Sequence, residues 1–81
     1  MFYVYILEDT NHKHYIGYSS DLKRRIREHI DGKTFTTKKM NRPKLVYYEA
    51  YNSETLSRER EKKLKQFGSS YKGLLKRIKL I

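Results

Sequence analysis

Five side chains in this sequence have the chemistry to cleave a phosphodiester bond together: Tyr5, Tyr15, Arg25, His29 and Glu59. A carboxylate can hold one divalent cation, Mg²⁺ with much of its water retained or Mn²⁺ in the same place. The cation and a guanidinium would neutralise the charge that grows on the phosphate. A phenol or an imidazole could position or deprotonate the attacking water. We therefore take these five as candidate catalytic residues, with Glu59 as the candidate metal ligand.

Each candidate also has a structural interpretation. Tyrosine is common in strands, so Tyr5 and Tyr15 could be ordinary sheet residues. Arg25 could be one of many solvated or phosphate-facing charges in a chain with 19 lysines and arginines. His29 could complement the dipole at the end of a helix. Glu59 lies among basic residues and could belong to a surface ion-pair network. The residues alone therefore predict a basic domain that binds nucleic acid, with a candidate metal carboxylate.

The charge balance favours a polyanionic partner. The chain of 81 residues carries 19 lysines and arginines against 9 acidic residues, a formal net charge of +10. Such a field attracts nucleic acid first and an anionic membrane surface second. We expect a nucleic acid, DNA or RNA, as the partner, and neither a membrane nor a stable protein partner. Six further cations are candidate nucleic-acid contacts: Lys23, Arg24, Arg27, Lys38, Lys39 and Lys63.

Composition also limits the class of protein. With no cysteine there is no disulfide framework and no thiolate metal site. No apolar run approaches the roughly 18 residues of a membrane span, and the first ten residues predict a strand rather than a signal peptide. We expect a cytoplasmic protein with one domain over residues 1–81. A chain of this length has room for a shallow surface groove rather than a deep cofactor cavity.

The elements that must position the candidates begin with a hairpin. Residues 2–7 and 13–18 are rich in aromatic and β-branched side chains, and residues 9–12 have the composition of a turn. If Leu7 pairs with Lys13, Tyr5 lies opposite Tyr15 and both hydroxyls share a face. A shift of one residue places Ile16 opposite Tyr5 and separates the two tyrosines. The sequence pattern leaves this register open.

The rest of the chain predicts three helices and one more strand. Ser19 or Ser20 can cap a helix with an apolar stripe at 22, 26 and 30, which ends near Gly32. Residues 33–41 predict a loop and residues 45–51 a third strand. A second helix begins near residues 52–54, with Leu56, Leu64 and Phe67 expected in the core, and a short helix follows from about residue 69. The predicted fold class is α+β, with a three-stranded antiparallel sheet flanked by helices in the order β-β-α-β-α-α.

The sequence resembles the GIY-YIG nuclease superfamily over nearly its whole length. Five matches follow in order: Tyr3-Val4-Tyr5, Tyr15-Ile16-Gly17 after nine residues, the basic segment that ends at Arg25, His29 where many members have His or Tyr, and Thr55-Leu56-Ser57-Arg58-Glu59. The runs RPKLVYYEAY and REREKKLK look most like the small bacterial single-domain members.

The resemblance implies the GIY-YIG fold and a mechanism. In it, Tyr5 or Tyr15 helps to activate the nucleophile, Arg25 holds the scissile phosphate, and Glu59 binds one divalent metal. It also favours the register with Tyr5 opposite Tyr15. Two departures from the family pattern are Tyr3 in place of the first glycine and the lack of any asparagine after Asn52.

The function expected from the resemblance is a metal-dependent DNA endonuclease with a GIY-YIG active site. The alternative is a non-catalytic nucleic-acid-binding module that keeps the fold and the basic face, and a third interpretation is a protein-interaction adaptor. A decayed site should have lost at least one of the five candidates, and this sequence retains all five together.

Overall fold

The structure, a computed structural model, describes residues 1–32 and 39–78. Three strands and three helices follow in the order β1 (Phe2–Glu8), β2 (His14–Ser19), α1 (Leu22–Ile30), β3 (Lys44–Tyr51), α2 (Glu54–Lys65) and α3 (Ser69–Arg77). The strands form an antiparallel sheet in the order β2-β1-β3. The predicted fold class and element order are confirmed. None of the helices described is long and apolar enough to cross a membrane.

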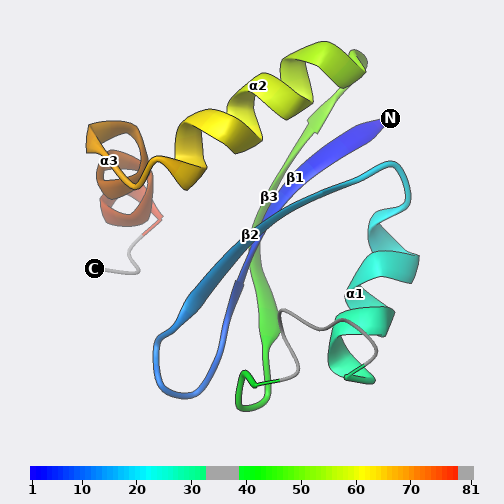
Figure 1. The fold of residues 1–81 in the computed structure, drawn as a ribbon, viewed down its shortest axis with the longest axis vertical. Coiled ribbons are helices and arrows are strands. Elements are labelled where there is room, and N and C mark those ends of the chain that lie inside the picture. Colours follow the sequence, from blue (N-terminus) through cyan, green and yellow to red (C-terminus); the bar gives the residue numbers. More distant parts are fainter. Residues whose placement is uncertain (33–38, 79–81) are drawn as a thin grey trace.

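The central strand β1 divides the molecule into two layers because its side chains alternate between the faces of the sheet. Val4 and Ile6 belong to the main core with residues of α2 and α3. Tyr5 points to the opposite face, where its ring meets that of His29 from α1. Figure 1 shows the resulting arrangement, with α1 on one side of the sheet and α2 and α3 on the other.

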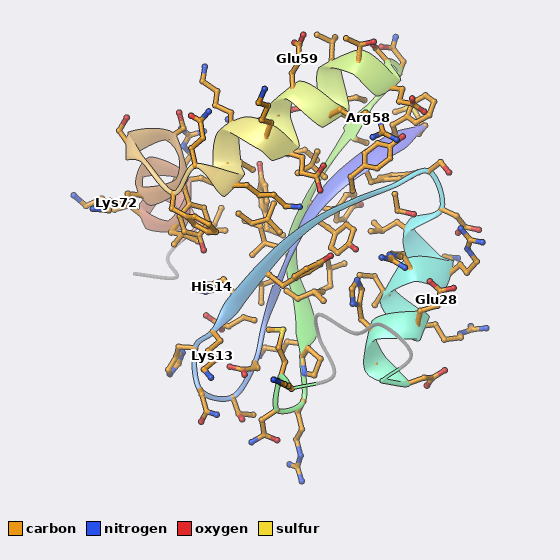
Figure 2. All side chains as sticks on the ribbon, viewed as in Figure 1. Lys13, His14, Glu28, Arg58, Glu59 and Lys72 are labelled. Carbon is orange, nitrogen blue, oxygen red and sulfur yellow. The ribbon has the colours of Figure 1, made fainter. Side chains whose placement is uncertain are left out.

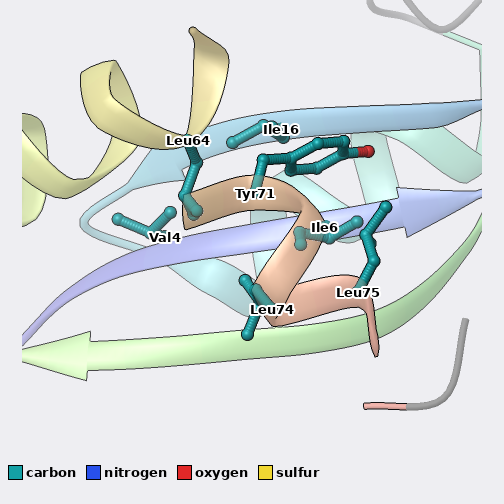
Figure 3. Close-up of a cluster of buried hydrophobic side chains, with 7 residues drawn as sticks. All are labelled: Val4, Ile6, Ile16, Leu64, Tyr71, Leu74 and Leu75. Carbon is teal, nitrogen blue, oxygen red and sulfur yellow. The ribbon is translucent and has the colours of Figure 1, made fainter. Parts of the chain in front are cut away.

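The main core lies between the sheet and the last two helices. Its buried members come from β1, β2, α2 and α3 and are Val4, Ile6, Ile16, Leu64, Tyr71, Leu74 and Leu75 (Figure 3). Apolar burial of this kind is the dominant favourable term in folding. The core therefore fixes α2 against β1 and β2, the two strands that carry the candidate tyrosines.

The register of the hairpin differs from both alternatives that the sequence offered. Tyr5 lies opposite Gly17, and Tyr15 lies opposite Leu7. The direct pairing of Tyr5 with Tyr15 was therefore wrong. Relative to that pairing the strands are displaced by two residues, and a shift of two keeps every side chain on its face. The two tyrosines still share one face as diagonal neighbours.

The turn between β1 and β2 accounts for this register. The Asp9 carboxylate accepts hydrogen bonds from the backbone N–H groups of Asn11 and Lys13, each at 2.9 Å. The Asp9 N–H donates to the Lys13 carbonyl at 3.0 Å, and His12 takes a positive φ of 62°. An acceptor side chain that satisfies two loop amides stabilises a longer connection than the predicted four residues. β2 accordingly begins at His14.

Helix α1 begins and ends near its predicted bounds, but its fully buried residue is not one of the predicted apolar stripe, of which Leu22 and Ile26 are half-buried. Asp21, rather than Ser19 or Ser20, is the N-cap, and its carboxylate accepts from the Arg24 N–H. Gly32, with φ of 70°, follows the C-terminus as predicted. The buried residue of α1 is His29, whereas Ile30 is 62% exposed. A polar side chain thus takes the position expected for an aliphatic one.

Helix α2 is rotated relative to the prediction. Leu56 and Phe67, both expected in the core, are 52% and 56% exposed, and the buried residues are Ser57 and Leu64. Ser57 tolerates burial because its hydroxyl donates to the Glu54 carbonyl at 2.7 Å. A small side chain there lets the helix axis approach the sheet closely. This rotation decides which carboxylate of α2 faces the hairpin.

Candidate active site

Tyr5 extends from the central strand across the edge strand β2. Its ring passes directly over Gly17, where a Cβ atom would overlap the Tyr5 ring carbons and the hydroxyl. Gly17 is therefore required by the space that the phenol occupies rather than by backbone conformation. Since β2 is an outer strand, the Tyr5 hydroxyl is carried toward an open edge of the sheet.

Tyr5, Tyr15 and His29 form one cluster of rings. The Tyr5 hydroxyl and His29 Nε2 are 2.7 Å apart, and the two side chains come from residues that are 0% and 1% exposed. The Tyr15 ring lies 6.3 Å from the Tyr5 ring and 5.1 Å from the His29 ring, measured between centroids. The cluster brings together three of the five predicted catalytic side chains.

The protonation states within the cluster follow from burial. Burial and the neighbouring Tyr15 raise the pKa of Tyr5 to about 12, despite an opposing hydrogen bond with Arg25. Burial, followed by the charge of Arg25, lowers the pKa of His29 below its usual 6.5. At neutral pH the phenol is therefore protonated and the imidazole is neutral. In the tautomer with its proton on Nδ1, His29 Nε2 accepts the hydrogen bond from Tyr5.

Arg25 links the buried cluster to solvent. Its guanidinium acts on the Tyr5 hydroxyl and donates to Glu28 Oε1 at 3.1 Å, while about a third of the side chain stays exposed. Burial lowers the pKa of Arg25, but Glu28 and Tyr5 outweigh it and raise the pKa overall. Arg25 is thus a permanent cation with an exposed part, as a phosphate contact requires. The sequence interpretation missed Glu28, although it lies three residues from Arg25 on the same helix.

Glu59 is not brought to this cluster. It is exposed on α2 and points away from the sheet (Figure 2). Each residue turns a helix by about 100°, which places Glu59 about 160° from the buried Ser57. The structure therefore does not bring Glu59 together with the other four candidates, and its role as metal ligand stays a prediction.

Glu61 is the carboxylate of α2 that faces the cluster. It lies about 40° around the helix from Ser57, beside the line that contacts the sheet. Its negative charge acts on the Tyr5 hydroxyl and contributes to the raised pKa of that group. The Glu61 side chain is 20% exposed and pairs with Lys65 at 3.1 Å. The sequence interpretation missed Glu61, but the i, i+4, i+7 spacing of Ser57, Glu61 and Leu64 is a signal that indicates it.

A divalent cation fits this donor set in one specific way. No group of three or more His, Cys, Asp or Glu side chains within residues 1–32 and 39–78 could enclose a metal ion. Mg²⁺, however, is commonly held by one or two carboxylates, with water and substrate phosphate completing its shell. Glu61, whose charge acts on the Tyr5 hydroxyl, can supply such a carboxylate. Lys65 is the cation that a metal would have to displace.

The predicted nucleic-acid contacts are exposed where the structure describes them. Lys23, Arg24 and Arg27 lie on α1, and Lys63 lies on α2. Arg24 pairs with Asp21 at 3.9 Å, a long contact between two exposed side chains. Lys39 is also exposed, and Lys38 lies outside the described residues. Their role in binding stays a prediction.

Comparison with known proteins gives consistent results. The model of the GIY-YIG catalytic domain matches residues 1–77. UPF0213 protein SSP2268 of Staphylococcus saprophyticus is 32% identical over 80 residues, 98% of this chain and 92% of the relative. UPF0213 protein HQ_3675A of Haloquadratum walsbyi is 33% identical over 66 residues, 80% of this chain and 74% of the relative. The solution NMR structure of UPF0213 protein BH0048 from Bacillus halodurans has a TM-score of 0.60 and 33% identity, and covers 98% of this chain and 86% of that chain.

Proposed function

Because the chain belongs to the GIY-YIG family, we propose that it is a metal-dependent endonuclease that hydrolyses phosphodiester bonds in DNA. One observation carries this proposal: the Tyr5 hydroxyl is buried against His29 Nε2 at 2.7 Å, and the Arg25 cation acts on the same group. A phenol that only packed in a sheet would not need both a proton acceptor and a cation at its oxygen. Within this proposal the metal ligand is Glu61 in place of the predicted Glu59.

Tyr5 and His29 act together on the attacking water. A phenol with a pKa of about 12 keeps its proton at neutral pH and cannot accept another while it does so. If Tyr5 passes its proton to the neutral His29 Nε2, its oxygen becomes free to take a proton from water. Arg25 stabilises the phenolate during this transfer. Tyr15 covers the cluster and contributes to the raised pKa of Tyr5.

Arg25 and Glu61 act on the phosphate. The exposed part of the Arg25 guanidinium binds a non-bridging oxygen, since a planar fork of donors matches a phosphate. Glu61 would hold Mg²⁺ or Mn²⁺, which as a Lewis acid stabilises charge on the phosphate and the leaving oxygen. Displaced from Glu61 by the metal, Lys65 would become available to the DNA backbone. The cations of α1 would hold the flanking phosphates.

The test is a plasmid-nicking assay with Mg²⁺ or Mn²⁺ on two matched variants of one helix. We expect Glu61→Gln to lower the nicking rate by about 10²-fold or more, the usual cost of removing an electrostatic stabiliser. Glu59→Gln removes the same charge from the opposite face of α2 and should retain nicking. Both variants should bind DNA at least as tightly as the wild type, because each removes an acid.

The possible outcomes separate the competing assignments. If Glu59→Gln loses nicking activity and Glu61→Gln keeps it, the metal ligand is Glu59. Equal, metal-independent nicking by the wild type and both variants would indicate a contaminating nuclease and refute the enzyme. A wild type that binds DNA without nicking it would instead be the non-catalytic module.

A further inference from the structure

A second network of polar side chains joins α2 to β3 on the face of the sheet opposite to Tyr5. Arg60 Nε and Arg60 Nη2 donate to the two carboxylate oxygens of Glu49 at 2.9 and 3.0 Å. The hydroxyls of Tyr47 and Tyr51 donate to the same two oxygens, both at 2.6 Å. We call these four residues the Glu49 clamp. The proposed mechanism uses none of them.

The Glu49 clamp is bidentate and partly buried, unlike the exposed ion pair between Arg58 and Glu54. The Glu49 and Arg60 side chains are 15% and 25% exposed, whereas Arg58 and Glu54 on the same helix are 61% and 55% exposed and 3.5 Å apart. Burial raises the pKa of Glu49, but the hydrogen bonds from Arg60, Tyr47 and Tyr51 outweigh it and lower the pKa overall. Bidentate, partly buried pairs fix geometry, while exposed pairs contribute little.

Arg60 and Glu61 are neighbours in sequence that flank the buried line of α2. Relative to Ser57, Arg60 is turned by about 60° toward one side and Glu61 by about 40° toward the other. Arg60 therefore faces β3, and Glu61 faces the side of β2. Contacts on that second side agree, since Tyr18 of β2 hydrogen-bonds to Glu54 and carries Arg58 over its ring. Any rotation of α2 that frees Arg60 from Glu49 also turns Glu61.

We propose that the Glu49 clamp sets the rotation of α2 about its axis and thereby holds the Glu61 carboxylate toward Tyr5. Arg60 and Glu49 are then positioning residues for Glu61, although neither touches substrate. The small side chain of the buried Ser57 does little to hold the helix against rotation at this point. The Glu49 clamp therefore restricts the rotation of α2. The role of Glu61 as metal ligand rests on the proposed function, but the orientation of Glu61 does not.

The first experiment tests orientation without metal or DNA. Glu61→Gln should shift the NMR signals of the Tyr5 ring in the wild-type background, because the Glu61 charge acts on Tyr5. In an Arg60→Gln or Glu49→Gln background most of this shift should be lost. The matched control is Lys62→Gln, which removes an exposed positive charge from the same helix and should leave the shift intact. An undiminished shift in both clamp backgrounds would overturn the proposal.

Milder variants keep the test usable if loss of the charge unfolds the protein. Arg60→Lys keeps the charge but loses the bidentate geometry, and Tyr51→Phe removes one donor from Glu49. Both should reduce the effect of Glu61→Gln on Tyr5 by an intermediate amount while the protein stays folded. A fall in melting temperature with an unchanged effect on Tyr5 would show that the clamp is only a structural brace, and would also overturn the proposal.

A second experiment connects the clamp to the metal. Binding of Mn²⁺ in the absence of DNA can be measured from the paramagnetic broadening of NMR signals near Glu61. The affinity should fall about tenfold in Arg60→Gln, the size expected when the support of a metal ligand is removed. In the nicking assay, raised Mn²⁺ should restore the rate of Arg60→Gln but not that of Glu61→Gln. If the wild type neither binds Mn²⁺ nor nicks DNA, the proposed function fails, whereas the orientation result still decides the clamp.

Discussion

Burial shifts the pKa values of Tyr5 and His29, the two hydrogen-bonded residues of the cluster, in opposite directions. Burial raises the pKa of Tyr5 to about 12 and lowers the pKa of His29 below 6.5. The proposed transfer needs His29 neutral, so kcat/KM for nicking should fall as the pH drops through the lowered pKa of His29. His29→Gln keeps a hydrogen-bond acceptor but cannot titrate, and it should lose about 10²-fold or more in rate. A pH–rate profile of both proteins measures this. An acid limb centred above pH 6.5, or the same limb in His29→Gln, would contradict the role of His29.

Helix α2 illustrates what the sequence can and cannot predict about an element. Periodicity and capping residues predicted its existence and its start, and Ser53 does cap it by accepting from the Leu56 N–H at 3.3 Å. The predicted rotation of the helix was wrong. Hydrophobicity favoured Leu56 for the core, and the sequence pattern could not reveal that the Ser57 hydroxyl finds a hydrogen-bond acceptor within the helix. Glu59 was assigned from the resemblance of residues 55–59 to the family motif, and that match says nothing about which side of α2 faces the hairpin. The register of the hairpin was missed for a related reason, since it depends on the two loop amides that Asp9 holds.

The rotation of α2 makes a direct prediction about stability. Ser57→Leu places a large side chain at a position that is 0% exposed and should lower the free energy of unfolding by about 1–3 kcal/mol through overpacking. Leu56→Ala, at a position that is 52% exposed, should change it by less than about 0.5 kcal/mol. Urea unfolding of both variants measures the two costs. The reverse order of the two costs would mean that α2 presents Leu56, not Ser57, to the sheet.

At the scale of the whole molecule, the net charge of +10 makes both the stability of the fold and the affinity for DNA depend on salt, but in opposite directions. Salt screens self-repulsion and should stabilise the fold. It should weaken binding to DNA, because the release of counterions into a more concentrated salt solution gains less entropy. If the five described predicted contacts Lys23, Arg24, Arg27, Lys39 and Lys63 each neutralise one phosphate, log Kd should change with log salt by a slope of about 4.5. A fourfold rise in salt then weakens binding about 500-fold.

Two matched charge removals test whether these contacts lie where they were predicted. Lys23→Gln on α1 should reduce the slope by about 0.9, the contribution of one neutralised phosphate. Lys72→Gln removes the same charge from α3, where Lys72 is exposed on the other side of the sheet (Figure 2), and should leave the slope unchanged. Fluorescence anisotropy with a labelled duplex over a salt series gives both slopes. Equal reductions would mean that DNA responds only to net charge, and a reduction for Lys72→Gln alone would move the DNA-binding surface to α3.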